Sequence, residues 1–117
     1  MHPIELPQLP DLFRDLHDLL QQVPRGNVTT YGDVAKALGN VIASRWVASC
    51  LLHDAISASW PSHRVVRADG SLGLYAHGDV DAKADALRAD GVRVSQGKVD
   101  LDTFGVRDFQ STRPLER

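Results

Sequence analysis

Apolar residues recur at helical spacing in the first part of the chain. Between Asp11 and Val23 they fall every three or four positions, which is the repeat of one face of an α-helix. Asp11 is a suitable N-cap residue, and Pro24 stops a helix. The pattern therefore predicts a helix over 11–23, preceded by an extended lead-in over 1–10 that holds three prolines.

Two shorter helical patterns follow and are separated by a glycine. The first predicts a helix over 31–38, where Thr30 and Asp33 loosely fit a capping box and Gly39 provides the C-terminal stop. The second predicts a helix over 42–52. Two short helices joined by a glycine turn match a helix-turn-helix, although many αα-hairpins have the same pattern.

The middle of the chain has the sequence signals of a strand, a turn and a further helix. Apolar and basic residues predict a strand over 64–67, followed by a turn over 68–71 that contains the favoured hairpin dipeptide Asp-Gly. An amphipathic helix is expected over 79–90, ended by Gly91. Its apolar side would be formed by Val80, Ala84 and Leu87.

The last part of the chain predicts a small hairpin. Residues 92–94 and 99–101 alternate around Gln96-Gly97, which suggests two short strands and a tight turn. The polar segment 104–117 has no strong pattern. The expected organisation is a lead-in over 1–10, one domain over 11–103 and a tail over 104–117.

Composition fits a single globular domain. The chain has 117 residues, 43% of them hydrophobic and 24% charged, and contains no apolar run of the roughly 20 residues that a membrane span needs. The N-terminus does not resemble a signal peptide, and the single cysteine, Cys50, excludes an internal disulfide framework. These features favour a cytoplasmic protein, expected to be a monomer.

The positions of the charged residues say more about a possible nucleic-acid partner than the net charge does. A net charge of -2 argues weakly against a nucleic-acid partner. Between residues 24 and 67, however, five basic residues stand against two acidic ones, and the acids gather later in the chain. A modest basic face of this kind could meet phosphates, with an affinity that falls as salt rises.

One hexapeptide, Pro61 to Val66, resembles the active-site signature Pro-Cys-His-Arg-Val of the O6-alkylguanine-DNA alkyltransferases. The similarity continues over 23–35, 38–40, 44–47 and 69–75, and residues 91–101 resemble the end of small alkyltransferase-like proteins. The resemblance implies the α/β, mostly helical, winged helix-turn-helix-like C-terminal domain of that family, with a small C-terminal hairpin. It leaves no room for the separate N-terminal domain of the full-length enzymes.

Ser62 stands where the resemblance places the alkyl-accepting cysteine. A thiol has a free pKa of about 8.5 and can be tuned toward the attacking thiolate, whereas a serine hydroxyl needs a dedicated base. The chain is therefore similar to the alkyltransferase-like proteins, whose usual residue here is tryptophan. This implies a non-catalytic protein that recognises O6-alkylguanine in duplex DNA by nucleotide flipping and directs it to nucleotide excision repair proteins.

The resemblance also implies the residues that contact DNA. Arg45 falls at the arginine that fills the gap left by a flipped nucleotide, and Tyr31 at the tyrosine that helps rotate the nucleotide outward. The alternatives are a surface arginine and a tyrosine half in the core. Small residues could let a helix approach the DNA backbone, or could simply pack against other helices; those predicted to meet DNA are Ala35, Ser44 and Ala48.

A lesion pocket is implied around the serine. Its expected members are Trp60, Ser62, Val65, Leu72, Tyr75, Ala76 and His77. Trp60 could supply an aromatic surface to the base, since residues two apart on a strand share a face. The alternative is a tryptophan of the core.

His63 resembles the histidine that activates the cysteine, and Asp90 falls at the glutamate behind it. Asp90 is shorter than glutamate and Asp54 replaces a family asparagine, which suggests that the hydrogen-bond chain has decayed. A serine hydrolase is disfavoured, because neighbours on a strand point to opposite faces and His63 would not reach Ser62. The five histidines lack metal-ligand spacing, so no metal or cofactor is expected.

Two further functions remain open from the sequence. One is an alkyltransferase, either active through Ser62 or Cys50 or inactivated by a Cys-to-Ser replacement. The other is a protein-interaction module that kept the fold and lost its affinity for DNA.

Overall fold

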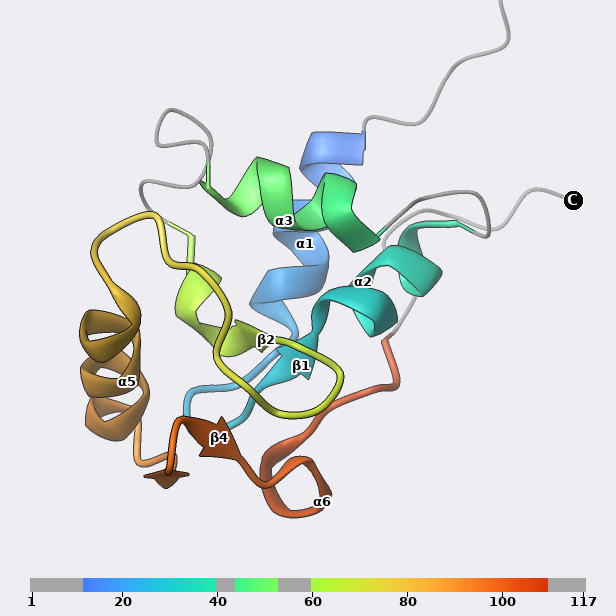
Figure 1. The fold of residues 1–117 in the computed structure, drawn as a ribbon. Helices are drawn as coiled ribbons and strands as arrows, with labels where there is room; N and C mark the ends of the chain where they lie inside the picture. The colour runs from blue at the N-terminus through green and yellow to red at the C-terminus, as the bar shows by residue number, and fades with distance from the viewer. Residues whose placement is uncertain (1–11, 40–43, 53–59, 110–117) are drawn as a thin grey trace, which may run out of the picture.

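Three helices form one end of the molecule. The computed structural model describes residues 12–39, 44–52 and 60–109. The helices are α1 (Leu12–Gln21), α2 (Tyr31–Leu38) and α3 (Ser44–Leu52), and Figure 1 shows α2 and α3 following one another beside α1. The three predicted helices are confirmed: the second has the predicted ends, the third ends at Leu52 as predicted, and the first ends at Gln21, two residues early. The starts predicted at residues 11 and 42 lie outside the described residues.

The helices enclose a first hydrophobic cluster. Its fully or nearly fully buried members come from one face of each helix and from the strand beside them. They are Leu16, Leu19, Leu20, Val34, Ala35, Leu38, Val47, Cys50, Leu51 and Val65. Cys50 is buried among them, as expected for a small apolar residue.

Helix α2 has the ends that its sequence predicts. The Thr30 hydroxyl accepts a hydrogen bond from the Asp33 backbone N–H at 3.1 Å and donates one to the Asp33 carboxylate at 2.9 Å. At the other end the Gly39 N–H bonds to the Ala35 carbonyl at 3.1 Å, with φ of 155° at the glycine. A side-chain cap at one end and a glycine at the other thus fix the length of the helix.

A two-residue parallel strand pair divides the core. Strand β1 (Thr29–Thr30) pairs with β2 (Val65–Val66), with Thr29 opposite Val65 and Thr30 opposite Val66. Successive strand residues point to opposite faces. Val65 therefore packs in the first cluster and Val66 in a second one.

The second cluster lies under α5 (Val80–Ala89) and a small hairpin. The hairpin consists of β3 (Val94–Ser95) and β4 (Lys98–Val99), joined by Gln96 and Gly97 with φ of 54° and 74°. This confirms the predicted hairpin, with each strand displaced by about a residue. The cluster comprises Val28, Val66, Leu72, Ala84, Leu87, Val92, Val94 and Val99.

The chain after the hairpin returns to the body of the domain. A short helix, α6 (Leu101–Phe104), is followed by an extended stretch in which the Val106 N–H bonds to the Val28 carbonyl at 2.7 Å. Phe109 packs against the first cluster. Residues 104–109 thus contact both parts of the core, although the sequence there has no strong pattern.

The predicted strand over 64–67 is wrong at its start. Residues Ser62–Arg64 form a 3-10 turn, η1, and only Val65–Val66 are extended. The Arg64 N–H bonds to the Pro61 carbonyl at 3.0 Å, which closes this turn ahead of the strand. The turn predicted at 68–71 is present, with Asp69 accepting hydrogen bonds from the Ser71 N–H and hydroxyl.

The expected apolar side of α5 also needs correction. Val80 is 50% exposed, whereas Lys83 is fully buried beside Ala84 and Leu87. The lysine takes an inward position because its ammonium group finds backbone carbonyls there. Asp79 caps the helix by accepting a hydrogen bond from the Ala82 N–H at 2.9 Å. Within the described ranges no helix is long and apolar enough to cross a membrane.

Candidate nucleic-acid interface

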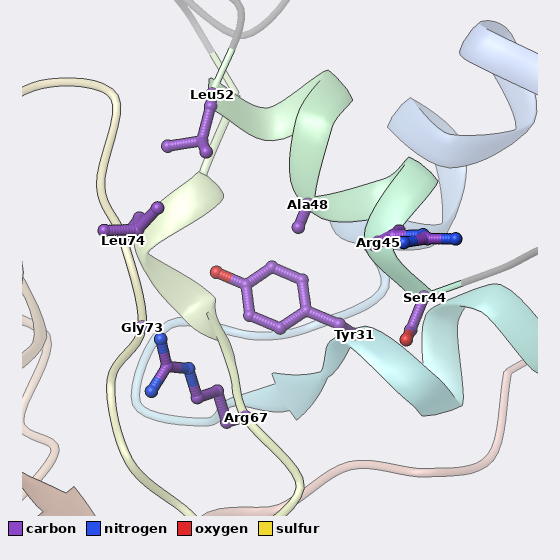
Figure 2. A pocket seen from close by; sticks show the side chains of 8 residues that line it. All are labelled: Tyr31, Ser44, Arg45, Ala48, Leu52, Arg67, Gly73 and Leu74. Carbon is purple, nitrogen blue, oxygen red and sulfur yellow. The ribbon is translucent and has the colours of Figure 1, made fainter.

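A cleft of about 220 Å³ opens between α3 and the segment that follows β2. Figure 2 shows the Tyr31 ring in its centre, with α3 on one side and Arg67 and Gly73 on the other. Four residues predicted to contact DNA line this cleft together: Tyr31, Ser44, Arg45 and Ala48. The fifth, Ala35, is buried in the first hydrophobic cluster instead.

Four further residues of the cleft were not anticipated from the sequence. They are Leu52, Arg67, Gly73 and Leu74. Arg67 directly follows β2, and the Leu74 side chain is 65% exposed. Among the described residues, two arginines from opposite walls and no carboxylate line the cleft, so this part of it favours an anionic ligand.

The Tyr31 hydroxyl lies at the inner side of the cleft. Burial raises the pKa of Tyr31, and the nearby Arg67 offsets this only in part, so the phenol is neutral at physiological pH. The chain passes very close to it at Gly73, where φ is +75° and an added Cβ would lie 3.3 Å from the hydroxyl oxygen. Only a residue without a side chain fits this approach without strain.

Lys83 lies behind the tyrosine and is fully buried. Its Nζ donates to the carbonyls of Val65 at 2.7 Å, Leu72, and Leu74 at 3.0 Å, and to the Tyr31 hydroxyl at 3.2 Å. Burial, reinforced by the like charge of Arg67, lowers the pKa of Lys83 to about 7.

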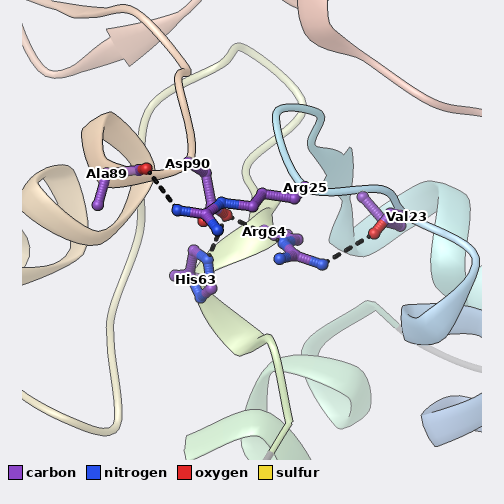
Figure 3. Close-up of polar contacts among 6 residues, drawn as sticks. All are labelled: Val23, Arg25, His63, Arg64, Ala89 and Asp90. Carbon is purple, nitrogen blue, oxygen red and sulfur yellow. Dashed lines mark hydrogen bonds and ion pairs between the residues drawn. The ribbon is translucent and has the colours of Figure 1, made fainter.

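A second polar cluster surrounds Asp90 and is drawn in Figure 3. Its carboxylate accepts from His63 Nε2 at 2.7 Å and from Arg64 Nε at 3.1 Å, and Arg25 Nε lies 3.3 Å away. Arg64 also donates to the Val23 carbonyl at 3.0 Å. Although it is shorter than glutamate, Asp90 thus reaches His63 directly, so this link of the hydrogen-bond chain is present.

The charge of Asp90 is stabilised by these partners. Burial raises the pKa of its carboxyl group, but hydrogen bonds from His63 and Arg64 outweigh this effect, so the pKa lies below its ordinary value. The cluster joins η1 to the end of α5 and to the turn after α1.

The Ser62 hydroxyl forms no hydrogen bond with the cluster around Asp90. It is 5% exposed, and its hydroxyl has no hydrogen-bond partner. The strand geometry expected at this point does not hold, because Ser62 and His63 belong to η1. His63 Nε2 nevertheless bonds to Asp90, and no described residue forms a hydrogen bond with the Ser62 hydroxyl.

The residues expected around a lesion pocket take several different positions in the structure. Trp60, Tyr75 and His77 line a separate polar recess of about 460 Å³ together with His63 and Arg64. Two other members, Val65 and Leu72, are buried in the two hydrophobic clusters, and Ala76 is half-buried. Asp54 lies outside the described residues.

Trp60 packs against the first hydrophobic cluster, and its ring centroid lies 5.1 Å from that of His17. Burial raises the pKa of the Cys50 thiol, which disfavours the thiolate needed for transfer chemistry. No group of three or more potential metal ligands occurs in the parts of the chain that the structure describes.

The helix-turn-helix and its cation-lined cleft define a DNA-binding domain. The family model described as "6-O-methylguanine DNA methyltransferase, DNA binding domain" matches residues 11–92. The chain belongs to this family, and its fold is that of the alkyltransferase-like DNA-binding domains.

Its relatives include enzymes and base-flipping proteins. A bifunctional methyltransferase/endonuclease of Picrophilus torridus is 42% identical over 107 residues, which cover 92% of this chain and 36% of the relative. The DNA base-flipping protein of Escherichia coli is 39% identical over 87 residues, covering 74% of this chain and 67% of that protein. The chain thus spans about a third of the bifunctional relative.

Solved structures share the fold. Atl1 of S. pombe, in complex with damaged DNA containing O6-carboxymethylguanine, superposes with a TM-score of 0.73 at 23% identity, over 87% of this chain and 100% of that chain. The O6-methylguanine-DNA methyltransferase of Pyrococcus kodakaraensis gives a TM-score of 0.58 at 34% identity, over 72% and 48% of the two chains.

Proposed function

We propose that this protein recognises O6-alkylguanine in duplex DNA by flipping the damaged nucleotide, without removing the alkyl group. The observation that carries the proposal is the common cleft of Tyr31 and Arg45. A tyrosine that displaces a nucleotide and an arginine that fills the vacated space must act on the same base pair, so they need to lie close together. The names of relatives that flip bases or bind damaged DNA support the same reading.

The non-catalytic part of the proposal rests on the two candidate acceptors. Ser62 has a buried hydroxyl without a base bonded to it, and Cys50 is a buried thiol of raised pKa in the core. Neither atom has the activation that attack on an alkyl carbon requires. A protein that binds damaged DNA without removing the alkyl group depends on other proteins to remove the lesion. We infer that nucleotide excision repair proteins do this.

The first experiment measures binding to one duplex with and without a single O6-methylguanine at fixed low salt, by fluorescence anisotropy. We expect tighter binding to the damaged duplex, full recovery of the methylated base afterward, and no gain of mass by the protein. Loss of the methyl group would identify an alkyltransferase. Equal binding to both duplexes would favour an interaction module.

Arg45→Ala tests the role of the arginine. Flipping costs a few kcal/mol of stacking and pairing, part of which an inserted guanidinium offsets. The variant should lose tenfold or more, as an order of magnitude, in affinity for the lesion and much less for plain duplex. Arg93→Ala, which removes an exposed arginine next to the hairpin, is the matched control. An equal loss of affinity for both duplexes would mean that Arg45 only contacts a phosphate.

A further inference from the structure

Lys83 is a buried charge that the proposed recognition step does not use. It is the largest fully buried side chain, and it comes from α5, on the far side of β2 from the helix-turn-helix. A lysine is almost never fully buried unless its ammonium group is paired or hydrogen-bonded. Its four acceptors therefore indicate what the side chain holds in place.

These acceptors belong to three separate segments around the cleft. One is the Val65 carbonyl of β2, two are the Leu72 and Leu74 carbonyls on either side of Gly73, and one is the Tyr31 hydroxyl. Gly73 and Leu74 line the cleft, as does Tyr31. A single amino group thus ties one wall of the cleft to the tyrosine inside it.

We propose that Lys83 is a positioning residue for DNA binding: its protonated amino group sets the Tyr31 hydroxyl and the 72–74 segment in the arrangement that receives the nucleotide, so binding is coupled to its protonation. This inference rests on the proposed function of the cleft.

Protonation changes the number of bonds that the group can donate. An ammonium has three donors and no acceptor, so its three N–H groups are shared among the four acceptors here, whereas a neutral amine has two donors and a lone pair. Loss of the proton therefore leaves one of the carbonyls without its bond and lets Tyr31 donate where it had accepted. Both changes act on residues that line or border the cleft.

The charged groups around Lys83 also indicate that DNA binding would favour its protonated form. The tyrosine of α2 is neutral, and the charged group that perturbs Lys83 is Arg67, next to β2, which has the same sign. No carboxylate accepts a hydrogen bond from Lys83 in the described part of the chain. Bound DNA would bring the missing negative charge and stabilise the ammonium form.

The pKa of about 7 places this coupling near neutral pH. Where only the protonated form is competent, the apparent affinity falls in proportion to its population. Between about pH 6 and about pH 8 the affinity for the damaged duplex should then fall by up to about tenfold. Histidines also titrate in this range, so the lysine must be separated from them by a variant.

Lys83→Met keeps the length of the side chain and removes the titrating group. Its affinity for O6-methylguanine duplex should be low at both pH values, and the part of the pH dependence that comes from Lys83 should be absent. Lys98→Met, which removes an exposed lysine of β4, should behave like the wild type. An identical ratio of affinities at the two pH values in wild type and Lys83→Met would overturn the proposal.

A direct titration keeps the inference testable if Lys83→Met does not fold. The chain has three lysines, Lys36, Lys83 and Lys98, so their Nζ signals are easily assigned by NMR after lysine labelling. Because coupling is reciprocal, the pKa of Lys83 must rise when DNA binds, by about one unit for each tenfold difference in affinity between its protonated and neutral forms. An unchanged pKa with bound plain or damaged duplex refutes the coupling, whereas absence of lesion preference at either pH refutes only the proposed function.

Discussion

The carboxylate of Asp90 should be a main stabilising contact of the domain. Its side chain is 10% exposed and accepts from His63 and Arg64, which are 17% and 18% exposed. Removing one partner of a buried ion pair costs about 3–5 kcal/mol, because the other charge stays buried without compensation. The neutral amide of Asp90→Asn retains some hydrogen bonding, so we expect a loss of about 3 kcal/mol.

Arg25 adds little to this value, because it is 70% exposed and exposed pairs are screened by water. The assay is urea unfolding at neutral pH, followed by tryptophan fluorescence. Asp85→Asn is the matched control: Asp85 is 79% exposed and lies 3.7 Å from Arg88 on the same helix, so its loss should cost less than about 0.5 kcal/mol. A difference between the two variants below about 1 kcal/mol would refute the reasoning.

The pH dependence gives an independent test of the same contact. The pKa of Asp90 is lower in the folded protein than its ordinary value, so the stabilisation is present above the ordinary pKa. It is lost as the pH falls through the lowered pKa of the folded state. Wild-type stability should therefore decline more steeply in acid than that of Asp90→Asn, and parallel curves would contradict the assignment.

Three further changes test the cleft and its surroundings. Gly73→Ala places a Cβ 3.3 Å from the Tyr31 hydroxyl at a positive φ, and it should cost about 1–2 kcal/mol in urea unfolding and weaken lesion binding. Ser62→Ala removes a buried hydroxyl without a partner, so stability should stay equal or rise by up to about 1 kcal/mol. Between about pH 7 and about pH 9 the lysine is neutral in the folded protein and protonated in the unfolded chain, because folding lowers the pKa of Lys83 to about 7. The free energy of unfolding should therefore rise with pH over this range, by at most about 1.4 kcal/mol per pH unit. Lys83→Met should lack this rise.

Local signals in the sequence predicted the helices and the hairpin well. The threonine before α2 and the glycine after it act within a few residues, and so do the turn residues between β3 and β4. The resemblance to a known family supplied the order of elements and placed Tyr31 and Arg45, which the structure brings into one cleft. Their roles in DNA binding stay predictions.

Contacts between distant segments could not be predicted in this way. The inward position of Lys83 depends on carbonyls 9, 11 and 18 residues away, and helical periodicity alone marks such a residue as polar and exposed. The extent of β2 was overestimated for a similar reason. Arg64 directly precedes the apolar pair Val65-Val66 in the sequence, but its side chain meets Asp90 from another element, and the chain turns at η1 instead.

The contacts of His63 show that a histidine–carboxylate pair can stabilise a fold whether or not it takes part in chemistry. If the only value of a histidine–carboxylate pair were to activate a nucleophile, loss of the thiol would leave both residues free to drift. Here the pair also joins η1 to the end of α5, and Arg64 of the same turn reaches the segment after α1. The domain would lose stability without it, whatever stands at position 62. A Ser62→Cys variant would therefore carry a thiol next to an intact His63–Asp90 pair. Methyl transfer by that variant but not by the wild type would support the proposal that Ser62 keeps this protein from acting as an alkyltransferase.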